Sequence, residues 1–165
     1  MKIARYSKEY EKEMLMLIGE FFDFHSGLVN DEITCTTSEE SLEIMVEWQQ
    51  DKNELYIVQE DDMAVGFLRL NYRGPIVAWI EDIYIAHHYR NKGIGTAVIL
   101  AAEDIVKSKQ GYEALCIDVV LRNEKAISLY HQLGFIDVSL ITLRKEFGRS
   151  KRDKKLDLFD KEFHY

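Results

Sequence analysis

Two carboxylates and a glycine-containing turn lie close together in residues 80–96, and they are the residues of this chain best suited to chemistry. Glu81 and Asp82 stand in the run WIEDIYIA, and a carboxylate can accept a proton from a reacting group. The turn that follows is Arg90-Asn91-Lys92-Gly93-Ile94-Gly95-Thr96. Its glycines permit a tight bend, and the unpaired N–H groups of a helix start bind anionic oxygens. The segment predicts a phosphate-containing ligand beside a general base, although a tight connection alone would also explain the glycines.

Two common phosphate-binding turns do not match this segment. A Walker loop ends in Gly-Lys-Ser or Gly-Lys-Thr, and no lysine follows Gly95. A dinucleotide-binding turn needs a third glycine in the first βα unit of a repeated fold, but Val98 stands at that place, after several expected strands. The remaining interpretations are a pyrophosphate held by one strand, turn and helix in a small α/β domain, and a turn that only connects two elements.

Hydrophobic spacing predicts the elements that position these residues. After a first strand at 3–6, helical periodicity runs through two helices, the second beginning with a capping box of Thr37 and Glu40. Residues 24–38 are expected to form the loop between them. We then expect three strands, a helix, a strand, a helix, and one or two final strands in 135–147. This order predicts an α/β (α+β) fold with a mixed sheet and helices on its faces.

The composition is that of a soluble globular protein. The chain of 165 residues is 47% hydrophobic and carries a net charge of -8, which argues against nucleic acid as a main partner. No apolar run reaches membrane-spanning length, and the N-terminus has no signal-peptide core. Cys35 and Cys116 are expected to be reduced and packed. We expect a cytoplasmic protein with no membrane partner, folded as one domain over 1–165 with a basic and aromatic tail at 149–165.

Two motifs of this chain resemble those of the GNAT superfamily of N-acetyltransferases. Arg90-x-x-Gly93-x-Gly95 after a strand is similar to the acyl-CoA-binding motif of that family. The segment LRNEKAISLYHQLGF is similar to the family pattern Asn-x-x-Ala-x-x-Leu-Tyr-x-x-x-Gly-Phe, which is matched by Asn123, Ala126, Leu129, Tyr130, Gly134 and Phe135. The motif-bearing part covers about 76–135. The resemblance implies a GNAT fold with a mostly antiparallel sheet in which two strands splay apart.

The resemblance implies acetyl-CoA as co-substrate. Its pyrophosphate would sit on the backbone amides of the turn, formed by Arg90, Asn91, Lys92, Gly93, Ile94, Gly95 and Thr96. The pantetheine arm would pair with the strand edge at Ile83, Tyr84 and Ile85, opposite the strand in EALCIDVV, and would contact Asn123, which is also a predicted helix cap. A backbone N–H near Ile83 would polarise the thioester carbonyl. No metal is expected, since no acidic or cysteine partner stands at a ligand spacing from the adjacent His87 and His88.

Glu81 and Tyr130 are the catalytic residues that the resemblance implies. A lysine-like amine has a pKa of about 10.4, so a carboxylate must take up its proton, directly or through water. Successive strand residues point to opposite faces, so we expect only one of Glu81 and Asp82 to face the cleft, and prefer Glu81. Its alternative is a surface or ion-paired carboxylate. Tyr130 matches the family tyrosine that protonates the departing thiolate, and its alternative is a core tyrosine.

The acceptor is the part that the sequence determines least. A primary amine of a small cationic molecule, polyamine- or aminoglycoside-like, would attack directly in a ternary complex. It would suit a gathering of Asp23, Asp31, Glu32 and Glu81. A protein N-terminus or lysine is the alternative acceptor, and a non-catalytic acyl-CoA sensor is the alternative of another class. The tail aromatic residues are expected to pack on the domain or at a homodimer contact.

Overall fold

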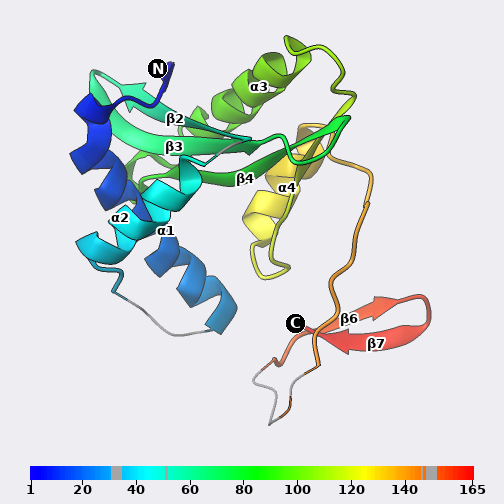
Figure 1. The fold of residues 1–165 in the computed structure, drawn as a ribbon. Coiled ribbons are helices and arrows are strands. Elements are labelled where there is room, and N and C mark those ends of the chain that lie inside the picture. The colour runs from blue at the N-terminus through cyan, green and yellow to red at the C-terminus, as the bar shows by residue number, and fades with distance from the viewer. Residues whose placement is uncertain (31–34, 51, 146, 148–151) are drawn as a thin grey trace. The chain divides into compact units, whose positions relative to one another are not determined.

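The computed structural model describes residues 1–30, 35–50, 52–145, 147 and 152–165 (Figure 1). The chain divides into two compact units, residues 1–118 and 119–165. No helix of the described ranges is long and apolar enough to cross a membrane.

The described residues of the first unit form five strands, three α-helices and two 3-10 turns. Their bounds are β1 Lys2–Arg5, η1 Lys8–Tyr10, α1 Glu11–Asn30, α2 Ser38–Trp48, β2 Asn53–Glu60, β3 Met63–Asn71, β4 Val77–Ile85, η2 His87–Tyr89, α3 Ile94–Lys107 and β5 Ala114–Ile117. The second unit contains α4 Glu124–Gln132, β6 Lys155–Leu158 and β7 Lys161–His164.

The sheet of the first unit is mixed and mostly antiparallel, as the resemblance implied. Its strand order is β1-β2-β3-β4-β5, and only the pair β4 and β5 is parallel. Asp61 and Asp62 join β2 to β3 with φ angles of 49° and 61°. Positive φ at both central residues of a two-residue turn matches the right-handed twist of the flanking strands, so this turn fixes the hairpin.

Two helices cover one face of the sheet and α3 covers the other (Figure 1). Phe67 of β3 and Tyr84 of β4 are paired across the strands and pack in one cluster with Met14 of α1 and Trp48 of α2. These side chains define what we call the α1–α2 face. The N-terminus of α2 carries the predicted capping box, because Thr37 accepts from the Glu40 amide and Glu40 accepts from that of Thr37.

The first helix is longer than the sequence predicted. Residues 24–30 belong to α1 rather than to a loop. The Phe24 ring lies 6.5 Å from the Tyr84 ring, so packing against β4 offsets the weak helix propensity of Ser26 and Gly27. Cys35 is exposed rather than packed.

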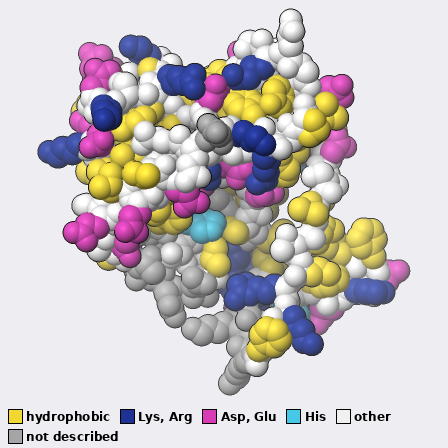
Figure 2. Space-filling view, viewed as in Figure 1, with side chains coloured by type: hydrophobic (Ala, Val, Ile, Leu, Met, Phe, Trp, Pro, Cys, Tyr) yellow, Lys and Arg dark blue, Asp and Glu magenta, His cyan; other side chains and the backbone are white. Residues whose placement is uncertain are grey.

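The second unit differs most from expectation. The described residues 136–145 contain no strand, and the two final strands are β6 and β7 of the tail. Phe159 and Asp160 have positive φ angles and form the hairpin turn between them. The alternating apolar pattern of 136–143 is typical of a strand, but a strand also needs a paired neighbour. Val138 and Leu140 are 82% and 72% exposed. Where Figure 1 places β6 and β7, Figure 2 shows hydrophobic side chains mixed with basic and acidic ones.

Candidate active site

A β-bulge in β4 brings both sequence-predicted carboxylates to one face of the sheet. Arg69 of β3 pairs with Asp82, but the next residue, Leu70, pairs with Ile80, so Glu81 is the extra residue. Paired residues of antiparallel strands share a face of the sheet. Asp82 and Arg69 therefore lie on the α1–α2 face, and the pair of Ile80 and Leu70 lies on the opposite face. Glu81 alternates from Ile80 and therefore also lies on the α1–α2 face. The expectation of one cleft-facing carboxylate rested on strict alternation, which does not hold at a bulge.

Asp82 is held by a short ion pair. Its Oδ2 atom lies 2.6 Å from both Nε and Nη2 of Arg69, and both side chains are largely buried. No hydrogen bond from the described residues reaches its other oxygen. The Arg69 guanidinium also lies 4.8 Å from the Trp48 ring centroid and donates to Asn53 Oδ1. Burial raises the pKa of the Asp82 carboxyl, although the positive charges of Arg69 and His25 oppose that effect.

Glu81 has a separate arginine. Its Oε1 atom lies 2.9 Å from Nη1 of Arg73, whose guanidinium stacks 4.1 Å from the Trp79 ring centroid. The approach does not have hydrogen-bond geometry, so Glu81 Oε1 is a buried oxygen that receives no hydrogen bond. Arg73 follows β3 and is 48% exposed, whereas Glu81 is 17% exposed. The bulge therefore carries two ion pairs side by side.

The pairing of β4 with β5 ends beside the bulge, where β5 itself ends. Their parallel register runs from Val77 with Ala114 to Ile80 with Ile117, where the pairing ends. Beyond this point β4 continues to Ile85 and is paired only with β3. In the described part of the chain, no strand covers the other edge of β4 at Ile83, Tyr84 and Ile85. An extended ligand could pair with that edge as an added strand would.

The turn after β4 presents backbone donors at a helix start. Gly93 is the N-cap of α3 with a φ of 79°, a left-handed conformation that glycine adopts without strain. The first helical hydrogen bond runs from Ala97 to Gly93, so the amides of 94–96 precede the helical ladder. Among the described residues, none of the amides of 91–96 has an acceptor. This arrangement suits a pyrophosphate.

The Arg90 side chain turns away from this donor set. Its Nε donates to the carbonyl of Ile85 at 2.8 Å, and its guanidinium lies 4.3 Å from the Phe24 ring centroid and 5.1 Å from that of Tyr84. The Tyr84 hydroxyl donates to Glu20 of α1. Burial, followed by the charge of Glu20, raises the pKa of Tyr84. Arg90 thus fastens the end of β4 to α1. Its backbone N–H donates to the carbonyl of His87, so the donor set of the turn consists of the amides of 91–96.

Two further predicted residues lie in the second unit. Asn123 Oδ1 accepts from the Ala126 amide and caps α4, as the sequence predicted. Burial raises the pKa of Tyr130 to about 12. Its ring centroid lies 6.0 Å from that of Phe135, and Gly134 has a φ of 93° just beyond the helix. Tyr130 therefore keeps its phenolic proton at neutral pH.

Asp23, a member of the predicted acidic gathering, has a partner within the first unit. Its Oδ1 accepts from the amide and the hydroxyl of Thr36, at 2.8 Å each, and so anchors the start of α2. Asp31 and Glu32 lie outside the described residues. Sequence reasoning missed Arg69 and Arg73, which pair with Asp82 and Glu81. The alternate spacing of Arg69 and Asn71 on β3 and of Arg73 just after it was the available signal, but the partners depend on the bulge.

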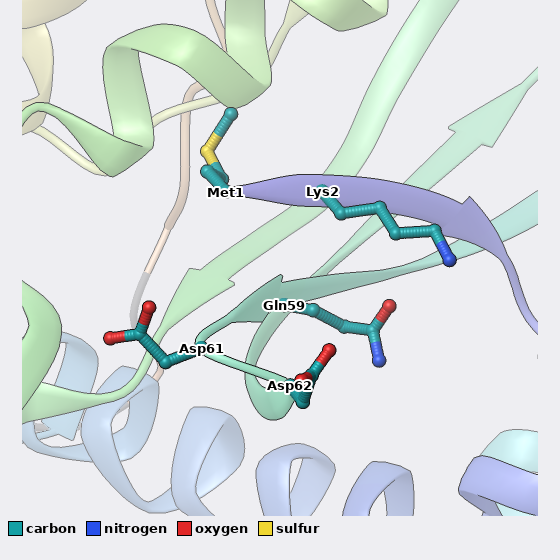
Figure 3. Close-up of a pocket in the computed structure, with 5 residues that line it drawn as sticks. All are labelled: Met1, Lys2, Gln59, Asp61 and Asp62. Atoms are coloured by element: carbon teal, nitrogen blue, oxygen red, sulfur yellow. The ribbon is translucent and has the colours of Figure 1, made fainter.

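A pocket elsewhere in the first unit has a different character (Figure 3). It lies beside β1 and the β2–β3 turn and is lined by Met1, Lys2, Gln59, Asp61 and Asp62. Two carboxylates disfavour a phosphate ligand, and no residue of β4 or of the turn 90–96 lines it. We therefore do not assign the acyl-transfer site to this pocket.

A family model described as the acetyltransferase (GNAT) family matches residues 25–135. The chain belongs to this family. The match includes the bulge of β4, the turn 90–96 and the whole of α4, so the two motifs and the geometry agree on the same segment.

Individual relatives are more distant. An N-alpha-acetyltransferase of Sulfurisphaera tokodaii is 34% identical over 78 residues, which are 46% of this chain and 47% of that protein. A thialysine N-epsilon-acetyltransferase of Mus musculus is 36% identical over 61 residues, 37% of this chain and 35% of that protein. The chain thus spans less than half the length of either curated relative. The aminoglycoside N-acetyltransferase AAC(6')-Iy, solved in complex with CoA, shares the fold with a TM-score of 0.65 at 17% identity, covering 89% of this chain and 95% of that one.

Proposed function

We propose that this chain is an acyl-CoA-dependent N-acetyltransferase that transfers the acetyl group of acetyl-CoA to a primary amine of a small molecule. The observation that carries the proposal is the end of β4–β5 pairing beside the Glu81 bulge, with the donor turn 91–96 beyond the end of β4. An open strand edge and a pyrophosphate cradle then lie along one element, which suits a ligand with an amide-bearing arm and a pyrophosphate.

The residues of the first unit fit acetyl-CoA. The backbone amides of 91–96 would hold its pyrophosphate, with the α3 dipole adding to the attraction. The edge of β4 at Ile83, Tyr84 and Ile85 would pair with its pantetheine arm. When bound, acetyl-CoA supplies a thioester carbonyl that an amine can attack. A backbone N–H of β4 near Ile83 would polarise that carbonyl.

The two carboxylates on the α1–α2 face take different parts in the proposal. Glu81, the residue preferred from the sequence, has a buried oxygen without a hydrogen-bond donor, so it would bind the ammonium group of the acceptor. Asp82 has a raised pKa and an oxygen that Arg69 does not bind, so it is proposed as the proton acceptor. The amine nitrogen then bonds to the acetyl carbon as the carbon–sulfur bond breaks.

Tyr130 is proposed as the acid that protonates the departing thiolate. Its support is the motif match and a pKa of about 12, which keeps the phenol protonated over the working range. Asn123 is proposed to contact the pantetheine while it caps α4.

Fewer observations bear on the class of the acceptor amine than on the donor. A polyamine or an aminoglycoside would suit several acidic residues, and among the described residues this proposal gives a ligand-binding part to Glu81. One relative is named for thialysine, a small amine, and another for N-alpha acetylation. The absence of a metal, a cytoplasmic location and a homodimer remain predictions of the sequence.

The test is to incubate the protein with acetyl-CoA and a panel of diamines, amino acids, aminoglycosides and N-terminal peptides, and to follow free thiol. We expect thiol release that depends on the amine. Tight binding of CoA without release from any amine would favour the sensor alternative. A calorimetric preference for ATP or NAD over CoA would overturn the assignment of the donor site.

A further inference from the structure

We propose that the acceptor amine belongs to a molecule that also carries a carboxylate, as a diamino acid does, and that Arg73 binds this carboxylate. This inference rests on the proposed N-acetyltransferase function and names the substrate class of the same site. It contrasts with a polyamine, which carries only positive groups.

The first support for this proposal is the balance of charges at the bulge. Asp82 is neutralised by Arg69 at 2.6 Å, and Glu81 lies 2.9 Å from Arg73. The two carboxylates and two guanidiniums sum to no net charge. A polycation gains little net Coulomb attraction from such a site, whereas a molecule with one ammonium and one carboxylate can meet both signs.

The second support is a pair of oxygens that accept no hydrogen bond within the described part of the chain. Glu81 Oε1 and Asn71 Oδ1 are buried oxygens that receive no hydrogen bond from the described residues. Asn71 of β3 pairs with Trp79 of β4. Glu81 stands two residues after Trp79 in β4, so the two side chains lie on the same face of the sheet. Both oxygens therefore lie on the α1–α2 face, where they are ready acceptors for the N–H groups of an ammonium. Buried acceptors are normally satisfied, so these two mark a place for a donor.

Arg73 supplies the positive group that the carboxylate of the acceptor would need. Its guanidinium has five N–H donors, and the ion pair with Glu81 involves one nitrogen, Nη1. The side chain is 48% exposed, so its other donors face solvent. Stacking on Trp79 at 4.1 Å holds the guanidinium plane in place. A fixed planar fork of donors is the geometry that binds carboxylates in a bidentate manner.

Matched amines test the proposal. L-Lysine and cadaverine differ only in the carboxylate, as ornithine and putrescine do, and lysinamide removes the negative charge while keeping the amines. We expect kcat/KM for lysine to exceed that for cadaverine and lysinamide by about tenfold, expressed mainly in KM. Arg73→Ala should remove this preference, because it deletes the carboxylate partner and frees Glu81 for a second ammonium. Arg5→Ala is the matched control, since Arg5 is another exposed arginine paired with a glutamate, Glu54.

The outcomes separate the two proposals. Thiol release that is as fast with cadaverine as with lysine would overturn the carboxylate inference and leave acetyl transfer standing. If no amine gives release, acetyl transfer itself fails. Calorimetric titration of lysine and lysinamide in the presence of CoA then still decides the inference: tighter binding of lysine that Arg73→Ala abolishes supports it, and equal binding contradicts it.

Discussion

Asp82 and Arg69 face each other across β4 and β3, with one carboxylate oxygen 2.6 Å from two guanidinium nitrogens. The pair lies one residue from the bulge beside which the pairing of β4 with β5 ends. One oxygen is thus committed to Arg69 while the other is not hydrogen-bonded by the described residues. This asymmetry is what allows a carboxylate to be fixed in position and still take up a proton.

Asp82→Asn should therefore cost more activity than Glu81→Gln. We expect Asp82→Asn to lower kcat/KM by about a hundredfold, the usual loss for a general base, and Glu81→Gln to act mainly on KM. Because burial raises the pKa of Asp82, wild-type kcat/KM should rise with pH through a limb above the range of an ordinary carboxyl. Steady-state kinetics over pH check this. A larger loss of kcat in Glu81→Gln would return the base role to Glu81, and thermal unfolding shows whether either variant is misfolded.

Tyr130→Phe should lower kcat by about a hundredfold with little change in the KM for the amine. The pKa of Tyr130 is raised to about 12, so its proton is retained throughout the range in which the protein is assayed. Wild-type kcat should accordingly show no decline from tyrosine ionisation up to about pH 10. The measurement is kcat against pH for both proteins. Equal turnover by Tyr130→Phe would remove the tyrosine from the acid role.

Glu54 should make the first unit sensitive to acid. Burial acts to raise the pKa of Glu54, but hydrogen bonds from Lys109, Tyr56 and Tyr72 outweigh it, and the pKa is lowered. In the unfolded chain this carboxyl has a pKa of 4.5. Because its pKa is lower in the folded protein, it stabilises the fold at pH values above 4.5, and this contribution is lost as the pH falls through the folded-state pKa.

Glu54→Gln should consequently reduce the free energy of unfolding at pH 7 by about 1–2 kcal/mol, with a difference that shrinks toward zero in acid. Denaturant unfolding at several pH values checks this. Glu43→Gln on the exposed side of α2 is the control and should change stability by less than about 0.5 kcal/mol. A Glu54→Gln effect that is constant with pH would contradict the assignment.

Gly66→Ala should disturb the end of β4. A Cβ at Gly66 would lie 2.3 Å from the Tyr84 carbonyl oxygen and 2.7 Å from Ile85 Cδ1. We expect a loss of about 1–3 kcal/mol in unfolding free energy and weaker CoA binding, since Tyr84 and Ile85 belong to the proposed pantetheine edge. Gly27→Ala in α1 is the matched control, because its Cβ meets nothing within 4 Å. It should leave CoA binding unchanged, as calorimetry would show.

Local patterns predicted most of the first unit. The capping box of Thr37, the glycine turn at Gly93 and the order of strands and helices up to α4 depend on short stretches of sequence, and the structure confirms them. The two motifs were likewise readable as family signatures, and the family match confirms them.

What the sequence could not predict depends on contacts between distant residues. The Glu81 bulge is a mismatch of register between β3 and β4, and alternation along β4 alone cannot predict it. The arginine partners follow from that register. The prediction of final strands in 135–147 was wrong for a related reason. The apolar alternation of 136–143 resembles that of a strand, but the paired strands lie within 155–164.

The transfer of a labelled acetyl group tests the central claim most directly. The protein is incubated with acetyl-labelled acetyl-CoA and L-lysine, and the products are examined by mass spectrometry. We predict the label in an amide of lysine, free CoA in equal amount, and loss of both products in the double variant Glu81→Gln, Asp82→Asn. Release of CoA with the label recovered as acetate, at a rate independent of the amine, would contradict the account.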